Sequence, residues 1–156
     1  INLATLQKKM LINNQNVIFI SHLTLTSIMV GLIWTIQLVH YPTFHFIDKN
    51  LYSSFQKFHM NSISLIVAPV MILELATGVL LLVVNSKNFL IIISFIILIL
   101  IWGITGVFFS GAHGKLITGY DALVVDKLVS MNWVRTILWT LKMLLLLGFL
   151  YFNNRS

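Results

Sequence analysis

The residues best suited to chemistry in this chain are polar side chains at the ends of long apolar segments. His40, His59, His113 and Arg135 each stand close to such an end. A neutral imidazole can exchange a proton near neutral pH, and an arginine can hold an anionic group. The pattern therefore predicts a site for acid–base chemistry, with His40, His59 and Arg135 as its catalytic residues.

Three uncharged polar residues accompany these side chains. Gln37 and Tyr41 lie on either side of His40, and Asn132 lies three residues before Arg135. Residues three apart share one face of an α-helix, so Asn132 and Arg135 would point the same way. Amide and phenol groups can orient a ligand through hydrogen bonds. We therefore expect Gln37, Tyr41 and Asn132 to bind the substrate.

The histidines also form a candidate metal site. The chain has no cysteine, so imidazole, carboxylate and amide oxygen are the available ligands, and Cu, Fe or Zn would suit them. Antiparallel helices would bring His40, His59 and His113 to one membrane face, where they would bind the ion. Because no spacing matches a motif such as HExxH, this prediction depends on clustering. Haem is the weaker alternative, since a strict bis-histidine pattern is missing.

The composition is that of a membrane protein. Of the 156 residues, 58% are hydrophobic and 9% are charged, whereas a soluble domain has roughly 25% charged residues. So few charges cannot cover a surface that faces water, and we expect contact with the lipid bilayer. The net charge of +6 comes from lysines and arginines spread along the chain, without a basic run, which argues against binding of nucleic acid.

Four segments are long enough to cross a bilayer, for which a helix needs about 20 mostly apolar residues. Pro42 is expected to end the first segment, and Ser130 to cap the last. We predict a single transmembrane domain over residues 1–156. Its four spans cover residues 17–41, 60–84, 89–110 and 131–152.

The connections define the topology. Residues 85–88 form a polar turn that is short enough only for an antiparallel hairpin. Residues 42–59 and 111–130 form longer connections at the opposite end. The sequence thus predicts an all-α fold, an antiparallel four-helix membrane bundle with two longer connections on one side.

The orientation follows from the charges in the loops. An even number of spans places both termini on the side of the short turn, which contains Lys87. Because lysine and arginine are enriched in cytoplasmic loops, we expect cytoplasmic termini. Residues 1–14 and 120–130 are expected to form short separate helices at the membrane surface.

Two charged residues fall inside the predicted spans. Glu74 and Lys142 each lie about ten residues from the end of the span on the side of the termini. A charge at that depth costs at least ~2.5–3.5 kcal/mol, so neither side chain is expected to face lipid. We predict a buried Glu74–Lys142 ion pair. Two roles for it remain open, namely fixing the geometry of the bundle or taking part in proton or substrate movement.

The third span carries few polar groups. Gly103, Gly106 and Ser110 give it a face of small residues, which predicts close helix packing. Its other face is uniformly apolar and could contact lipid, other membrane subunits or a second copy of the chain.

Two stretches carry a resemblance to known proteins. QLVHYPTF, residues 37–44, and NWVRTILWT, residues 132–140, resemble a group of small bacterial four-helix integral membrane proteins and, more distantly, the anthrone-oxygenase-like family. That family shares the four spans and an Asn-x-x-Arg element at the start of the last helix, here Asn132 and Arg135. The resemblance covers most of the chain. It implies an oxygen-dependent oxidation of an aromatic or otherwise lipophilic substrate. The resemblance to bacterial membrane proteins also implies a location in the bacterial inner membrane.

Three functions are compatible with these features. The first is a membrane oxidoreductase that acts on a lipophilic substrate at a site near one membrane face, lined by histidine and arginine. The second is a non-catalytic subunit of a membrane protein complex. The third is a transporter or channel protomer that uses the Glu74–Lys142 pair, which would require oligomers because four helices rarely enclose a pore alone.

Overall fold

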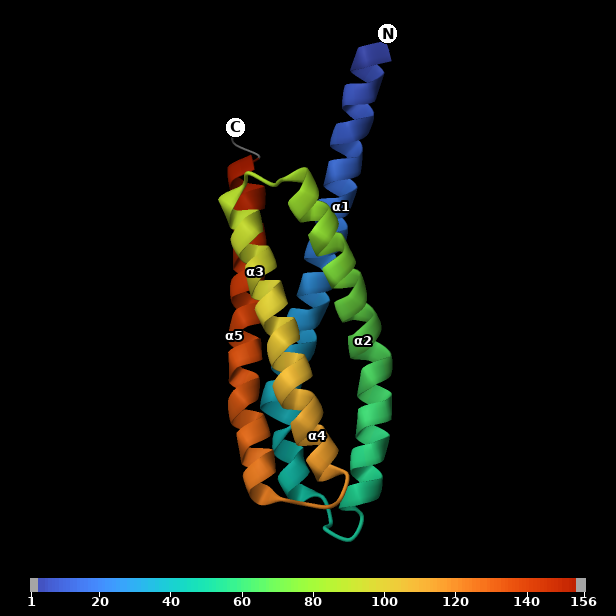
Figure 1. The fold of residues 1–156 in the computed structure, drawn as a ribbon, viewed down its shortest axis with the longest axis vertical. Helices are drawn as coiled ribbons and strands as arrows, with labels where there is room; N and C mark the ends of the chain where they lie inside the picture. Colours follow the sequence, from blue (N-terminus) through green and yellow to red (C-terminus); the bar gives the residue numbers. More distant parts are fainter. Residues whose placement is uncertain (1–2, 154–156) are drawn as a thin grey trace.

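The computed structural model describes the backbone of residues 3–153 and the side chains of residues 14–153. Within this part of the chain there is no strand, so the predicted all-α fold is confirmed. The long helices lie side by side as an elongated bundle (Figure 1). In chain order the elements are α1 (Leu3–Thr35), η1 (Ile36–His40), η2 (Pro42–Phe46), α2 (Tyr52–Val84), α3 (Phe89–Ile104), η3 (Thr105–Phe109), α4 (Ser110–Leu116) and α5 (Ala122–Asn153).

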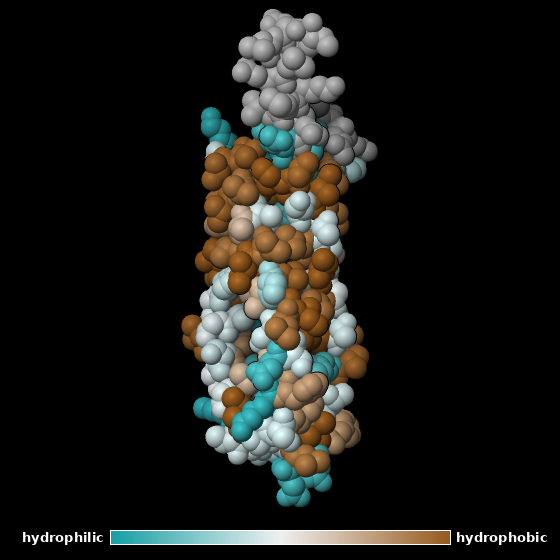
Figure 2. All heavy atoms as spheres, turned by 90° about the vertical axis from the view of Figure 1, so that its right-hand side faces the viewer, coloured by the Kyte–Doolittle hydropathy of each residue, from teal (hydrophilic) through white to brown (hydrophobic). Residues whose placement is uncertain are grey.

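The outer surface of the bundle is apolar. Large hydrophobic side chains such as Leu65 and Val83 are 78% and 69% exposed. Figure 2 shows a broad apolar band over much of one side, with more polar residues toward the end that carries the longer connections. The chain is an integral membrane protein whose helices contact lipid. The stretches that are long and apolar enough to cross a membrane are Asn14–Phe46, Tyr52–Val84, Phe89–Leu116 and Ala122–Asn153.

Two of the four membrane-crossing stretches contain a π-helical segment. α1 continues into η1, and α3 continues through η3 into α4, so each stretch has one turn with wider backbone spacing. Pro42 then begins η2, a 3₁₀ helix, at a first-turn position where its missing N–H breaks no hydrogen bond. Both π-helical segments lie toward the end of the bundle that carries the longer connections.

Several helix ends differ from the prediction, three of them near the longer connections. α2 begins at Tyr52 rather than at residue 60, α5 begins at Ala122 rather than at residue 131, and residues 111–116 are helical rather than a loop. The reason is that hydropathy falls where a helix leaves the apolar part of the membrane, whereas its backbone hydrogen bonds continue. The two connections lie on one side, as expected, and remain longer than the 85–88 turn, but both are shorter than predicted.

The start of α5 shows which residue caps it. An Oδ1 atom of Asp121 accepts hydrogen bonds from the backbone N–H groups of Leu123 and Val124, at 2.9 and 3.2 Å. Asp121 is therefore the N-cap, and the expectation for Ser130, which lies within α5, is wrong.

Neither of the separate surface helices is present. Residues 122–130 belong to α5, and the backbone of α1 runs without a break from Leu3 to Thr35. The side chains of residues 1–13 lie outside the described part. Arg155, a basic residue at the same end, lies outside it as well.

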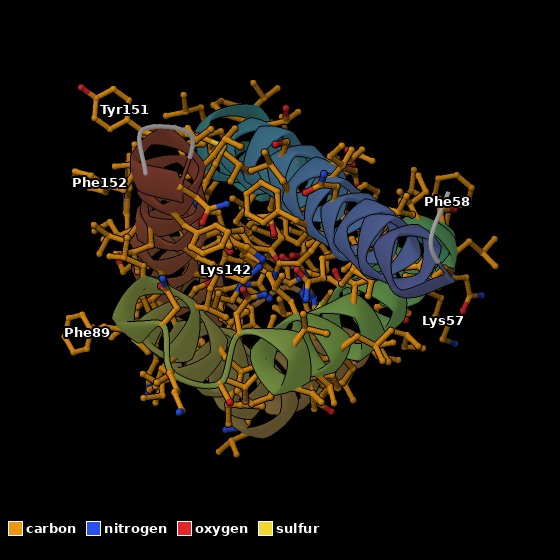
Figure 3. The ribbon with its side chains drawn as sticks, turned by 90° about the horizontal axis from the view of Figure 1, so that it is seen from above. Lys57, Phe58, Phe89, Lys142, Tyr151 and Phe152 are labelled. Atoms are coloured by element: carbon orange, nitrogen blue, oxygen red, sulfur yellow. The ribbon has the colours of Figure 1, made fainter. Side chains whose placement is uncertain are left out.

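Buried apolar side chains form three clusters along the bundle axis. The cluster next to the 85–88 turn includes Leu81 and Leu146, and the middle cluster surrounds Trp139. The third, near the longer connections, includes Tyr41 and Phe44. Seen along the axis, the labelled side chains Lys57, Phe58, Phe89, Tyr151 and Phe152 point outward, whereas Lys142 points toward the centre (Figure 3).

The third span packs closely against α2 at a glycine of α2, and not at its own small residues. A Cβ atom at Gly103 or Gly106 would meet no other atom within 4 Å, so the predicted packing through these residues is wrong. At Gly78 of α2, by contrast, a Cβ atom would lie 2.9 Å from Cδ2 of Leu98 in α3. The two helices thus meet tightly at Gly78 and leave open space beside Gly106.

Candidate functional site

Three histidines converge at the end of the bundle that carries the longer connections. Nε2 of His40, in η1, lies 2.8 Å from Nδ1 of His59, in α2. The ring centroids of His59 and His113, in α4, are 5.3 Å apart. His113 was expected in a loop, but it lies in a short helix that aims its ring at the other two. The structure therefore brings together all three residues proposed as metal ligands, from three different elements.

His113 is held by two polar partners. Nε2 of Gln56 lies 2.9 Å from Nδ1 of His113, and the hydroxyl of Tyr41 lies 3.1 Å from Nε2. Because an amide NH₂ group can only donate, Nδ1 of His113 accepts, and in the neutral ring the proton stands on Nε2 and is donated to Tyr41. Gln56 was missed from sequence, although it lies three residues before His59 on the same helical face.

His59 has one ring nitrogen without a protein partner. Its side chain is 4% exposed, and Nε2 forms no hydrogen bond. Because buried polar atoms are nearly always hydrogen-bonded, an unpaired one is a sign of a missing ligand or water. His59 lines a cavity between α2 and the α3–η3–α4 stretch, together with Tyr41, His113 and Arg135.

This cavity, called here the lateral cavity, has a volume of about 520 Å³. Its walls are mostly apolar and include Val67 and Met71 of α2 and Phe109 of η3. Several lining residues, such as Ala68 and Gly106, are exposed on the outer surface of the bundle. The lateral cavity therefore opens sideways between α2 and η3, on a surface that contacts lipid.

Two further polar atoms in the lateral cavity have no partner. Nε1 of Trp102 and Oγ1 of Thr105 are buried and form no hydrogen bond, like Nε2 of His59. Trp102 and Thr105 lie on the opposite wall from α2, deeper in the bundle than His113. Neither was singled out from sequence, because a lone polar residue in an apolar run is usually only a packing residue. The cavity thus offers hydrogen bonds along its length.

Arg135 is held by a chain of hydrogen bonds from α5 to η1. Its Nε donates to Oδ1 of Asn132 at 3.1 Å, and Nδ2 of Asn132 donates to Oε1 of Gln37 at 2.9 Å. Nε2 of Gln37 donates to the carbonyl of Val129 at 3.3 Å. The residues expected to bind substrate are therefore close to Arg135, but Asn132 and Gln37 orient the arginine rather than line the lateral cavity.

The charge of Arg135 is buried without an acidic partner. The side chain is 6% exposed, and its guanidinium carbon lies 3.8 Å from the ring centroid of Phe109. Among the described residues, no carboxylate forms an ion pair with it. A buried charge is costly unless it is paired, and guanidinium stays protonated in proteins. Arg135 is thus prepared to bind an anionic group in the lateral cavity.

Glu74 and Lys142 belong to a separate hydrogen-bond network, in which each contacts more than one polar partner. Nζ of Lys142 lies 2.8 Å from Oε1 of Glu74, and both side chains are fully buried. Thr26 donates to Oε1 of Glu74 at 2.9 Å and accepts from Lys142 at 2.6 Å, while Nε1 of Trp139 donates to Oε2 at 3.2 Å. Neither charged residue lines the lateral cavity.

The described residues contain no group of three or more potential ligands placed to hold a metal ion. The histidine nitrogens are instead hydrogen-bonded to one another, to Gln56 and to Tyr41. Metal binding would require several of these bonds to be exchanged. His45 lies outside the cluster, between the hydroxyl of Tyr120 at 3.0 Å and Asp126 at 3.2 Å.

Both π-helical segments border the site. η1 supplies His40 and Gln37, and η3 supplies Phe109 and part of the cavity wall. Such segments occur often at functional sites, because the extra residue turns side chains away from the regular helical positions.

Comparison with protein-family models, curated proteins and solved structures gave no match. A four-helix bundle supports many unrelated activities, so the fold alone does not define one. The function has to be inferred from the lateral cavity and the side chains at its polar end.

Proposed function

We propose that this chain is a membrane oxidoreductase that binds a lipophilic substrate in the lateral cavity. The observation that carries the proposal is the combination of an apolar, sideways-opening cavity of about 520 Å³ with His59, His113 and Arg135 at one end. Small-molecule sites are typically cavities of this size, apolar over most of their surface, with few polar groups that orient the ligand. Here the polar groups include two imidazoles and an unpaired cation.

The substrate would enter from the bilayer. The lining residues Ala68 and Gly106 are exposed on the surface that contacts lipid. An apolar body would pack against Val67 and Met71, and a polar head would reach His59 and Arg135. This arrangement suits a molecule that dissolves in the membrane, because no charged side chain has to be displaced along the path.

His59 would act as the base. If its Nδ1–H donates to Nε2 of His40 across their 2.8 Å contact, Nε2 of His59 is left with an unpaired lone pair, in a residue that lines the lateral cavity. When Nε2 takes a proton from the substrate, the resulting imidazolium keeps its hydrogen bond to His40. Arg135 would stabilise the negative charge left on the substrate, an interaction that grows as the proton departs.

The oxidation itself is proposed from the resemblance of residues 37–44 and 132–140 to the anthrone-oxygenase-like family. The deprotonated substrate is more easily oxidised than the neutral one, and molecular oxygen would be the electron acceptor. We propose the predicted location as well. The bacterial inner membrane follows from the resemblance, and Lys87 in the short turn favours cytoplasmic termini.

Occupation of the lateral cavity can be tested by native mass spectrometry of protein purified from its membrane in mild detergent. Gly106→Leu would fill the cavity, and Gly31→Leu is the matched control. Both glycines lie exposed within long apolar stretches, and a Cβ atom at either would meet no other atom within 4 Å. We expect a lipophilic small molecule bound to the wild type and to Gly31→Leu, and not to Gly106→Leu. Equal occupancy in all three would contradict the proposal.

A further inference from the structure

We propose that a second groove, on the outside of the bundle between α4 and the start of α5, binds a phospholipid with an anionic headgroup. The groove has a volume of about 350 Å³ and runs between η3–α4 and the first turns of α5. It shares no lining residue with the lateral cavity. We refer to it as the lysine groove, because Lys115 of α4 and Lys127 of α5 lie on its two sides.

The two lysines carry positive charge that no acid neutralises. Both side chains are exposed, and within residues 14–153 neither forms an ion pair with a carboxylate. Nζ of Lys127 lies 5.5 Å from the ring centroid of Phe108, which also lines the groove. Two cations from different helices therefore flank one depression, and a phosphate is a suitable ligand for such a pair because it can accept hydrogen bonds from both.

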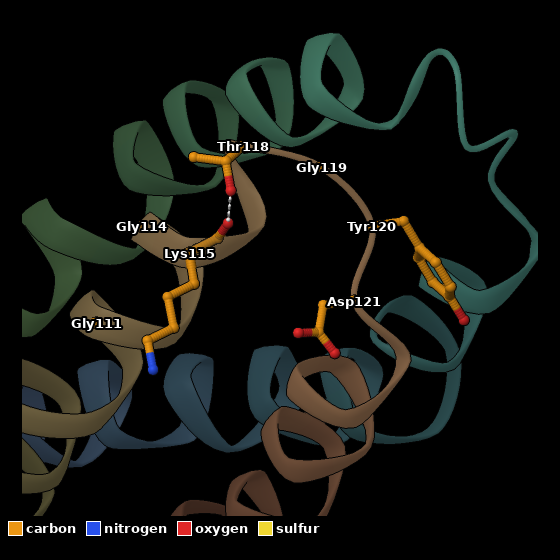
Figure 4. A pocket seen from close by; sticks show the side chains of 7 residues that line it. All are labelled: Gly111, Gly114, Lys115, Thr118, Gly119, Tyr120 and Asp121. Carbon is orange, nitrogen blue, oxygen red and sulfur yellow. Dashed lines mark hydrogen bonds between the residues drawn. The ribbon is translucent and has the colours of Figure 1, made fainter.

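The two nearest acidic residues are engaged elsewhere. Asp121 lines an adjoining depression of about 720 Å³ that it shares with Lys115 (Figure 4). Its carboxylate accepts two backbone N–H bonds as the cap of α5. Asp126 lies 3.2 Å from Nε2 of His45. No acidic residue lines the lysine groove, so the residues that line it carry a net positive charge.

The apolar part of the groove points to a lipid rather than to a free anion. Val107 and Leu123, which line it, are 85% and 80% exposed. The groove lies where the third span ends at Leu116 and the fourth begins at Ala122, so it is at the membrane surface. Basic side chains near a membrane surface attract anionic headgroups, and the neighbouring apolar side chains of the groove would contact the acyl chains. One molecule that satisfies both is an anionic phospholipid.

The test compares two lipids with identical acyl chains. The purified chain is titrated in detergent with dioleoyl phosphatidylglycerol or with dioleoyl phosphatidylcholine, and bound lipid is counted by native mass spectrometry while thermal unfolding is followed. We expect the anionic lipid to bind more tightly and to raise Tm more. Lys115→Gln combined with Lys127→Gln should weaken its binding roughly tenfold or more, since each lysine near a membrane surface contributes about 1 kcal/mol.

Lys57→Gln is the matched control. Lys57 is an exposed lysine at the same end of the bundle. It points outward from α2 (Figure 3) and does not line the lysine groove. Its variant should bind the anionic lipid like the wild type. Equal binding of the two lipids, an equal loss in Lys57→Gln, or an equal rise in Tm with inorganic phosphate alone would each overturn the proposal. If the double variant does not fold, the single variants and the wild-type comparison of the two lipids decide it.

Discussion

His40 and His59 lie 2.8 Å apart, nitrogen to nitrogen, although one comes from the π-helical end of the first span and the other from the second span. The contact fixes the ring of His59 so that its second nitrogen, Nε2, is buried beside the lateral cavity without a partner. Because His40 contacts a base and does not line the lateral cavity, we regard it as a positioning residue.

Replacing His40 by alanine should lower turnover more than substrate binding. His59 would keep its place in the helix but lose the partner that orients its ring and stabilises its protonated form. We expect kcat to fall by roughly tenfold or more, but by no more than the 10²–10⁴-fold that a general acid or base itself contributes, while KM changes little. A rise in KM with unchanged kcat would show that His40 acts in binding instead.

Arg135 should discriminate between charged and neutral ligands. Arg135→Gln removes a buried cation that has no acidic partner, so binding of a lipophilic carboxylate should weaken while binding of the corresponding alcohol stays the same. Arg135→Lys keeps the charge and should retain part of the preference. Titration calorimetry in detergent micelles measures both affinities. An equal loss of affinity for the carboxylate and for the alcohol would mean that Arg135 maintains the shape of the cavity and does not bind the anionic group.

Breaking the buried ion pair should destabilise the bundle strongly. Glu74→Ala leaves Lys142 as an uncompensated charge among buried side chains, which typically costs about 3–5 kcal/mol. Lys142→Met in the same chain should restore most of the lost stability. Unfolding in a denaturing detergent measures both changes.

The same pair separates a geometric role from transport. If Glu74→Gln keeps its fold but abolishes uptake of a solute into liposomes, the network belongs to a transport path. For the stability prediction, the contradicting outcome is a Glu74→Ala/Lys142→Met variant that is as unstable as Glu74→Ala alone. The unpaired charge of Lys142 would then not be the cause of the instability.

The start of α5 offers a simple test of the observed helix boundary. Asp121→Ala removes the side chain that accepts two backbone N–H bonds, and should lower the free energy of unfolding by about 1 kcal/mol. Ser130→Ala, at the residue expected to be the cap, should have almost no effect, because Ser130 lies within the helix. Thermal unfolding of both variants measures the difference. A larger effect at Ser130 would contradict the observed boundary.

The features that could be predicted from sequence are those that follow from hydropathy and from the position of a residue along its membrane-crossing helix. Long apolar runs define the four spans, and the polar turn at residues 85–88 defines the hairpin. Glu74 and Lys142 could be assigned to one level because each is the same distance from its helix end. Asn132 and Arg135 share a helical face at a spacing of three residues, and they are hydrogen-bonded in the structure.

Other features gave no such signal. Gln56, Trp102 and Thr105 are single polar residues in helices, and only the folded arrangement shows that they contact the histidines or line the lateral cavity. No residue pattern in the sequence marks a π-helical segment. The directions of His40 and Phe109 around their helices could therefore not be derived from regular α-helical spacing. The predicted spans were too short, because hydropathy declines before the backbone hydrogen bonds end: α2 and α5 start earlier than predicted, and the third span ends later.

Oxygen consumption tests the central claim most directly. Wild-type protein in detergent would be supplied with the lipophilic extract of its own membrane, and uptake of oxygen would be compared with His59→Gln and with His45→Gln. His45 is an exposed histidine outside the cluster and serves as the matched control. We predict uptake by the wild type and by His45→Gln, and its loss in folded His59→Gln. Equal uptake in His59→Gln and the wild type would contradict the assignment of His59 as the base.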